Sequence, residues 1–147
     1  MVVRTLAAGP RARNGGTIVL VLEGLRILVV DDDLDAREMT TAMLKSAGAA
    51  VRNVSSAVDA LEALDVARSD LIVSDLAMPN MDGYQLMKLL RARETAAGVE
   101  RVPAVAVSGH AFRADVDRAL AAGFDAHMAK PVDMHALIEV VRRLSSR

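Results

Sequence analysis

Short apolar runs alternate with helical periods from residue 25 to residue 146, and this alternation predicts the fold class. The run at residues 27–30 is continuous and rich in β-branched side chains, which is typical of a strand buried on both faces of a parallel sheet. Similar runs predict further strands, at residues 51–54, 71–73, 104–107 and 126–128. Apolar positions at helical spacing predict a helix after each strand, beginning near residues 36, 56, 83, 116 and 133.

Five strands that alternate with five helices predict an α/β protein with a parallel sheet and right-handed crossovers. The run at residues 51–54 is more polar than the others, so we place it at an edge of the sheet. Ser56 and Asp59 have the spacing of a capping box, and Asp133 is expected to cap the last helix. We expect the helices to bury aliphatic side chains and methionines, among them Leu86, Leu89, Leu90, Met39, Met43 and Met87.

Residues 1–24 differ in composition from the rest of the chain. They carry three arginines and no acidic residue before Glu23, and several glycines and a proline interrupt them. This composition predicts a flexible leader with one short β-prone stretch at residues 17–22. The remaining residues, 25–147, are expected to form a single domain.

The overall composition excludes several classes of protein. A chain of 147 residues can bury a sizeable core, and the absence of cysteine excludes thiolate catalysis, disulfides and cysteine zinc sites. The net charge of −1 and the aromatic content of 2% argue against direct nucleic-acid binding. Since no apolar run approaches the about 20 residues that a spanning helix needs, we expect a soluble, cytoplasmic protein.

Polar side chains follow the apolar runs at the points where the strands end. Residues 31–33 are three consecutive aspartates after the first run, and Asp75 follows the third. Ser108 ends the fourth run and Lys130 ends the fifth. Because ligands of open α/β sheets bind beyond the carboxyl ends of the strands, we expect these side chains to form one site.

Carboxylates that meet at such an edge repel one another, and a bound cation would relieve the repulsion. Oxygen ligands favour a hard ion such as Mg²⁺. The charges of three carboxylates, one Mg²⁺ and the ammonium of Lys130 cancel. Such a pocket can neutralise the oxygens of an incoming phosphoryl group, and an aspartate beside the metal is a candidate nucleophile toward phosphorus.

Four segments, in this order, resemble the receiver domain of two-component signalling. They are residues 25–33 (LRILVVDDD), 70–83 (DLIVSDLAMPNMDG), 105–110 (VAVSGH) and 123–133 (GFDAHMAKPVD). The resemblance covers about residues 25–146. It implies a flavodoxin-like, doubly wound (βα)5 fold whose five-stranded parallel sheet has the order 2-1-3-4-5.

The resemblance also implies roles for the acidic residues. Asp75 matches the phosphoacceptor of the family. Asp31 and Asp32 match the acidic pair that holds Mg²⁺, with Asp75 and the backbone carbonyl of Ala77 as the remaining protein ligands. Asp33, in contrast, is expected to cap the following helix or to face solvent.

Ser108 and Lys130 match the switch hydroxyl of the family and the lysine that pairs with phosphate. In such domains the bond between this lysine and the following proline, here Pro131, is often cis, which would direct the lysine into the pocket. His127 stands at the switch position where tyrosine or phenylalanine is commoner, so the rearrangement is expected to differ here. His110 and Ala77 match positions that, in the family, influence the dephosphorylation rate.

By resemblance, the chain is a switch that takes a phosphoryl group onto Asp75 from a histidine kinase or a histidine phosphotransfer protein, with Mg²⁺ as cofactor. Such a module is not an enzyme beyond its own phosphorylation and dephosphorylation. Two alternatives stay open: a Mg²⁺-dependent aspartyl-phosphate phosphohydrolase of the haloacid dehalogenase type, and a receiver-like interaction module that is never phosphorylated. Association of two copies also stays open.

The segment at residues 123–133 looks most like receivers at the ends of hybrid sensor kinases. Residues 14–22 faintly resemble the last glycine box and strand of a kinase ATPase domain. We therefore weigh two origins: the receiver end of a hybrid kinase, and a stand-alone receiver with an unstructured leader. In both cases the leader is too short to bind ATP.

Overall fold

The computed structural model describes residues 4–6, 18–109 and 112–146. One sheet of five parallel strands forms its centre, and these are β3 (Arg26–Val30), β4 (Ala50–Val54), β5 (Leu71–Asp75), β6 (Ala104–Ser108) and β7 (Ala126–Ala129). The strands lie in the order β4-β3-β5-β6-β7, and every neighbouring pair is parallel. This confirms the predicted flavodoxin-like fold with the order 2-1-3-4-5.

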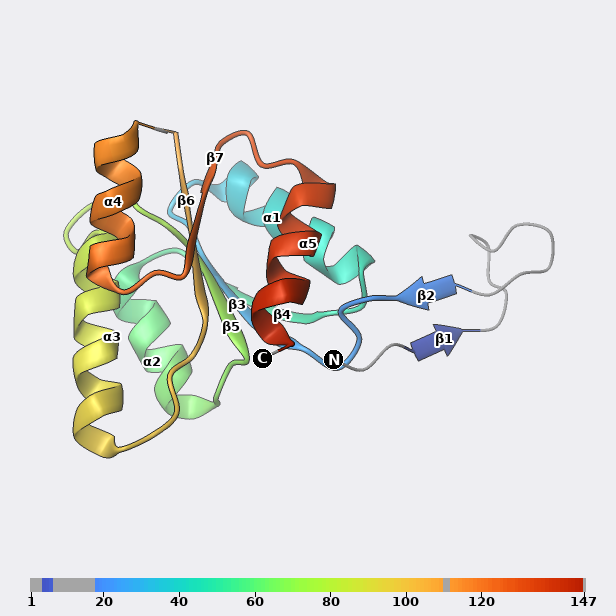
Figure 1. Cartoon of the computed structure of the whole chain (residues 1–147), viewed down its shortest axis with the longest axis horizontal. Coiled ribbons are helices and arrows are strands. Elements are labelled where there is room, and N and C mark those ends of the chain that lie inside the picture. The colour runs from blue at the N-terminus through green and yellow to red at the C-terminus, as the bar shows by residue number, and fades with distance from the viewer. Residues whose placement is uncertain (1–3, 7–17, 110–111, 147) are drawn as a thin grey trace.

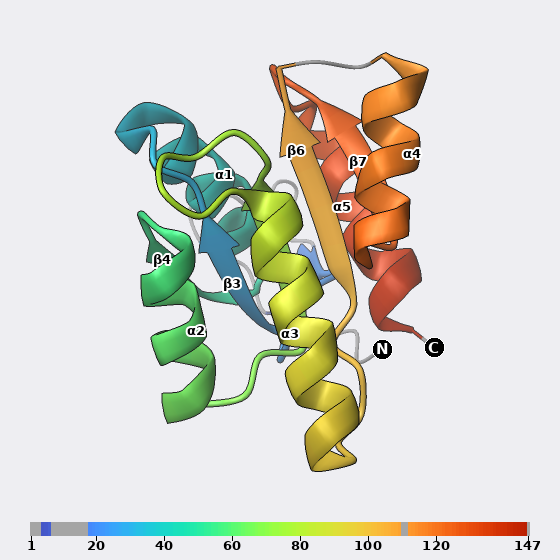
Figure 2. The same ribbon diagram turned by 90° about the vertical axis from the view of Figure 1, so that its left-hand side faces the viewer.

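Helices cover both faces of the sheet. On one face lie α1 (Leu34–Ser46) and α5 (Met134–Ser145), and on the other lie α2 (Ala57–Val66), α3 (Gly83–Ala97) and α4 (Arg113–Ala122) (Figures 1 and 2). Each layer buries its own cluster of aliphatic side chains against the sheet. Among the described residues, no helix has both the length and the hydropathy needed to cross a membrane.

The burial of the strands follows their hydrophobicity. Every residue of β5 and β6 is buried, as expected of central strands that read as continuous apolar runs. The edge strand β4 has no buried residue, which confirms its predicted position. The polar residue at the end of each central strand is therefore held in place by a strand that packs against helices on both faces of the sheet.

Side-chain caps begin most of the helices close to the strand ends. Asp33, Ser56 and Asp133 each accept a hydrogen bond from the third backbone N–H that follows, so the predicted caps at these positions are present. Asp82 and Gln85 form a reciprocal capping box at the start of α3, with bonds of 2.8 and 2.9 Å. In contrast, α4 begins after Phe112 without a side-chain cap.

Two predicted core positions are wrong. Leu89 is 37% exposed and Met39 is 57% exposed. The buried stripe of α3 includes Leu86 and Leu90, and Leu89 lies about 100° from Leu90 around the helix axis, toward solvent. In α1 the buried residues are Thr40, Thr41 and Leu44, so the inward stripe lies one position later than the apolar spacing indicated.

A charged cluster at the other end of the sheet was not predicted. Arg91 and Arg101 both donate to the carbonyl oxygen of Gly123, the residue that ends α4. Asp125 accepts from Arg101 at 2.5 Å and from the backbone N–H of Ala104 at 2.8 Å. These contacts join α3, the end of α4 and the start of β6, so the charges serve the packing of the fold.

The N-terminal segment forms a small hairpin before the sheet. Strands β1 (Arg4–Leu6) and β2 (Ile18–Leu20) pair antiparallel and project from the body (Figure 1). Leu22 is fully buried, and its N–H donates to the carbonyl of Ala47 at 2.8 Å, so packing against the domain begins before residue 25. Most of the predicted flexible leader lies outside the described residues, and its flexibility stays a prediction.

Candidate functional site

The carboxyl ends of four strands meet at one edge of the sheet. Parallel pairing places Asp75 opposite Val107 and Ser108 opposite Ala129, so the residues that follow lie side by side. Lys130 follows directly on Ala129, and its backbone N–H donates to the carbonyl of Ser108 at 2.8 Å. The register therefore explains why residues far apart in the sequence meet here.

Three carboxylates gather at this edge. Oxygens of Asp31, Asp32 and Asp75 all lie within 4.8 Å of one another. Asp31 and Asp75 are buried, with 5% and 6% of their surface exposed, whereas Asp32 is exposed to solvent. A set of oxygen donors with one open side fits a hard divalent cation that retains water ligands. The structure thus places the predicted metal-binding carboxylates together.

Lys130 neutralises part of this charge. Its Nζ donates to Asp31 Oδ2 at 3.0 Å and lies 3.4 Å from Asp75 Oδ1. Burial alone would lower the pKa of Lys130, but the hydrogen bonds and charges of the two aspartates outweigh it and raise the pKa above its usual value. The ammonium therefore stays charged at neutral pH. The bond from Lys130 to Pro131 is cis, as the resemblance implied.

The surroundings of Asp75 disfavour the ionisation of its carboxyl group. Burial is the largest cause, and the charge of Asp31 adds to it; together they raise the pKa of Asp75 from 3.8 to about 6. The charge of Lys130 and hydrogen bonds from Lys130 and the Ala77 backbone oppose the rise. Asp75 is therefore a carboxylate at neutral pH, and it is held in surroundings that favour the loss of its charge.

Asp31 is fixed from two sides. Its Oδ1 accepts the backbone N–H of Asp33 at 2.9 Å. Its backbone carbonyl accepts a hydrogen bond from Arg37 Nη1 at 2.9 Å, and the same guanidinium reaches Asn53 Oδ1 at 3.2 Å. Nothing in the sequence pattern indicated Arg37, because an arginine in the first turns of a helix is normally assigned to solvent. Here it connects α1 to β4 behind the acidic cluster.

The loop after Asp75 depends on a close approach by Gly83. The backbone N–H of Gly83 donates to the carbonyl of Leu76 at 2.9 Å. A Cβ at residue 83 would lie 2.4 Å from the carbonyl oxygen of Asp75 and 2.9 Å from the Cα of Leu76. Both are backbone atoms that cannot easily move, so only glycine fits here. The turn predicted for Asp82 and Gly83 thus also sets the position of Asp75.

Ser108 contacts His127. The Ser108 hydroxyl lies 2.8 Å from His127 Nε2, and Ser108 is only 4% exposed. The sequence indicated both residues as switch positions but did not indicate a direct bond between them. Ala77, the other residue predicted to contribute to the site, is exposed in the loop after β5. His110 lies outside the described residues.

A cavity of about 500 Å³ adjoins the site on the side of α4. Ala77 and Ser108 line it, together with Tyr84 and Arg118. The guanidinium of Arg118 stacks over the ring of Tyr84 at 3.9 Å, which links α4 to the start of α3. The loop after Asp75 and the N-terminal half of α4 therefore border the same space.

Comparison with known proteins agrees with this geometry. Residues 27–142 match the family model of the response regulator receiver domain. The chain belongs to this family. Over 125 residues it is 34% identical to the sensor histidine kinase RcsC of Salmonella typhi. The matched region spans 85% of this chain but only 13% of RcsC.

Two solved structures of receiver domains resemble the chain closely. One is the receiver domain of the histidine kinase CKI1 from Arabidopsis thaliana, complexed with Mg²⁺ and BeF₃⁻. It has a TM-score of 0.74 at 33% identity, and the match covers 86% of this chain and 93% of the CKI1 receiver chain. The second structure is the receiver domain of the sensor histidine kinase PA1611 from Pseudomonas aeruginosa PAO1, with magnesium in its active-site cleft. It has a TM-score of 0.75 at 31% identity, and the match covers 84% of this chain and 99% of the PA1611 receiver chain. The receiver is a phosphoacceptor module of two-component signalling, not a classical enzyme.

Proposed function

We propose that this receiver accepts a phosphoryl group on Asp75 from the phosphohistidine of a histidine kinase or a histidine phosphotransfer protein, with Mg²⁺ bound. One observation supports this most strongly: the ammonium of Lys130 lies within 3.0 Å of Asp31 and 3.4 Å of Asp75. A cation fixed beside an acceptor carboxylate can neutralise an oxygen of the arriving phosphoryl group.

Asp31, Asp32 and Asp75 would hold the Mg²⁺, together with the backbone carbonyl of Ala77. The all-oxygen donor set and its closeness within 4.8 Å support this assignment. When bound, Mg²⁺ would supply positive charge beside the phosphoryl oxygens. With Lys130 it would also balance the three carboxylates, which otherwise repel one another.

The transfer itself needs little from the protein beyond position and charge. A carboxylate oxygen of Asp75 attacks the phosphorus of the donor, and a P–O bond forms while the P–N bond breaks. The departing imidazole nitrogen keeps the electron pair of the broken bond. Asp75 must be ionised to attack, and a pKa of about 6 leaves most of it ionised at neutral pH.

The consequence of phosphorylation would be a change in the surface formed by α4, β7 and α5. Ser108 ends β6 and would donate to a phosphoryl oxygen on Asp75, and in this structure His127 of β7 contacts its hydroxyl. A partner that binds this surface would then sense the state of Asp75.

Intact-mass measurement after incubation with acetyl phosphate and Mg²⁺ tests the proposal. We expect one phosphoryl adduct on the wild type, none on Asp75→Asn, and none on the wild type when EDTA replaces Mg²⁺. Asp33→Asn is the matched control, because asparagine keeps the cap on α1 and the adduct should be unaffected.

Each other outcome has a definite meaning. A wild type without an adduct would overturn the phosphoacceptor assignment and favour an interaction module that is never phosphorylated. An adduct that survives in Asp75→Asn would move the acceptor to another residue. Continuous release of phosphate from many phosphate esters would favour the phosphohydrolase.

The relatives suggest a setting for the reaction. The chain corresponds to 13% of the length of RcsC, so a place within a hybrid kinase phosphorelay is part of this proposal. A cytoplasmic location is also part of this proposal. We expect no direct contact with nucleic acid, and sedimentation measures whether two copies associate.

A further inference from the structure

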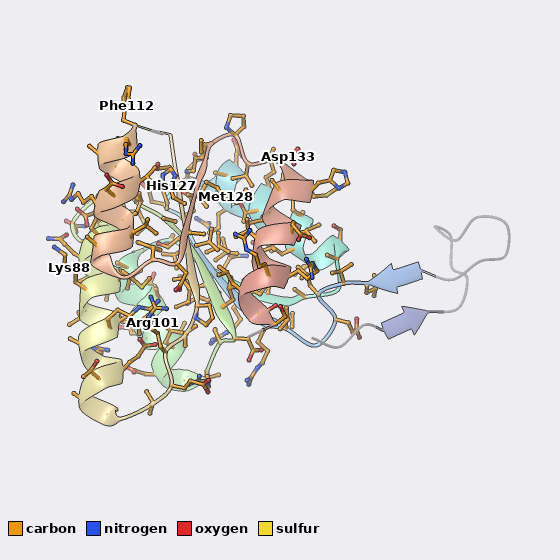
Figure 3. All side chains as sticks on the ribbon, in the orientation of Figure 1. Lys88, Arg101, Phe112, His127, Met128 and Asp133 are labelled. Carbon is orange, nitrogen blue, oxygen red and sulfur yellow. The ribbon has the colours of Figure 1, made fainter. Side chains whose placement is uncertain are left out.

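The bond between Ser108 and His127 follows from the register of two strands. Ala106 pairs with His127 and Ser108 pairs with Ala129, so His127 is the diagonal neighbour of Ser108. Alternation along the strands places both side chains on the face that packs against α3 and α4, where Ala106 is buried, while Met128 packs on the opposite face. Figure 3 shows His127 on the side of β7 nearest α4.

Ser108 ends β6, the strand that pairs with the strand of Asp75, and its hydroxyl contacts this imidazole. The backbone of Ser108 is fixed, because its carbonyl accepts the N–H of Lys130 at 2.8 Å and it ends a strand that pairs with Asp75. Rotation about the Cα–Cβ bond is therefore the movement by which the hydroxyl can change partners. In this structure one partner of the hydroxyl is His127 Nε2, at 2.8 Å.

We propose that His127 is a positioning residue for the switch: its Nε2 accepts the proton of the Ser108 hydroxyl and competes for it with a phosphoryl group on Asp75. A serine hydroxyl has a single proton to donate, and a phosphoryl oxygen offers only acceptor sites. Donation to the phosphoryl group therefore breaks the bond to His127. This inference rests on the proposed function of Asp75.

A tyrosine or phenylalanine at residue 127 would behave differently. Neither ring presents an acceptor nitrogen to the hydroxyl, so neither would hold it through an N···H–O bond. In this chain the imidazole adds a cost to phosphorylation, because one hydrogen bond must be exchanged for another. Because His127 lies in β7, the loss of that bond would also alter the contacts of β7, which packs beside α4.

Nitrogen-15 NMR of the histidine side chains tests this directly in the full chain. In the free protein we expect the Nε2 of His127 to lack a proton and to show the shift of a hydrogen-bonded acceptor. Addition of Mg²⁺ and beryllium fluoride, with binding followed by fluorine NMR, should move this resonance toward that of an unbonded nitrogen. Ser108→Ala without beryllium fluoride should give the same position.

The outcomes separate the two proposals. A protonated Nε2 in the free protein, or an Nε2 resonance that stays unchanged when fluorine signals show beryllium fluoride bound, would overturn the role of His127 alone. Absence of any bound fluorine signal would overturn the proposed function of Asp75, and the role of His127 with it.

Variants give a second, independent measurement. Removal of the competing acceptor in His127→Phe should tighten beryllium fluoride binding about fivefold, the equivalent of one ordinary hydrogen bond. His127→Gln keeps an acceptor atom and should bind like the wild type. In a Ser108→Ala background, His127→Phe should have no effect. An equal gain in both backgrounds would show that His127 acts through packing and would overturn the proposal.

Discussion

Replacement of Asp75 by asparagine removes a carboxylate whose ionisation is disfavoured by its surroundings. Its pKa is raised from 3.8 to about 6, mainly by burial and then by the charge of Asp31. At about 1.4 kcal/mol for each tenfold change, this shift corresponds to about 3 kcal/mol of lost stability when the group is fully ionised. We therefore expect Asp75→Asn to be more stable than the wild type by up to about 3 kcal/mol in the absence of divalent cations.

The sign of the effect depends on pH in a defined way. A raised pKa in the folded state means that protonation favours folding. The stability that the protonated form of Asp75 allows is therefore fully present below its unfolded pKa of 3.8 and is lost as the pH rises through about 6. Asparagine does not titrate, so the two proteins should have nearly equal stability at about pH 3 and differ most at about pH 8.

Urea denaturation followed by far-ultraviolet circular dichroism measures this difference, since the chain has no tryptophan. The experiment compares wild type and Asp75→Asn in EDTA at both pH values, with the exposed Asp117→Asn as a control that should change stability little. Saturating Mg²⁺ should reduce the advantage of the variant, because the wild type binds the ion more tightly. An asparagine variant that is less stable than the wild type at about pH 8 without metal would refute the reasoning.

Three further substitutions test other contacts of the fold and the site. Gly83→Ala should lower the free energy of unfolding by about 1–3 kcal/mol, because the new Cβ would lie 2.4 Å from the carbonyl oxygen of Asp75. Urea denaturation measures this loss, and Gly109→Ala is the control, because a Cβ at residue 109 would have nothing within 4 Å. Equal losses in the two variants would contradict the close approach at Gly83. Asp125→Ala should cost about 2 kcal/mol or more, whereas Asp65→Ala, from an exposed ion pair of 3.8 Å, should cost less than about 0.5 kcal/mol; the opposite ranking would show that the cluster around Asp125 is unimportant. Lys130→Gln should raise the pKa of Asp75 further, because it removes a cation 3.4 Å away; a carboxyl NMR titration measures this, and a lower pKa would contradict the pairing.

The hydrophobic pattern predicted the sheet and the site well because both depend on the same strands. Runs such as residues 71–73 are buried on both faces, so their composition alone indicates their place in the sheet. Once strands are parallel, the residues that follow them must meet at one edge. Asp31, Asp75 and Lys130 were therefore predictable as neighbours, although the sequence separates Asp31 and Lys130 by 99 positions.

The contacts that the sequence did not indicate depend on side-chain direction and on register. The two guanidinium groups that meet at the carbonyl of Gly123 have no periodic pattern that would set them apart from other surface arginines. The bond between Ser108 and His127 requires the register of β6 and β7, which no local signal specifies. Leu89 and Met39 were misplaced because helical spacing leaves the centre of the buried stripe uncertain by one residue.

The identity of the phosphoacceptor is the central claim, and reductive trapping tests it most directly. Borohydride reduces an acyl phosphate to an alcohol and would convert the phosphorylated aspartate to homoserine, which tandem mass spectrometry can locate. After phosphorylation with acetyl phosphate and Mg²⁺, we predict homoserine at residue 75 and at no other aspartate. Homoserine at residue 31 or 32, or none at residue 75 in protein that carries the adduct, would contradict the account.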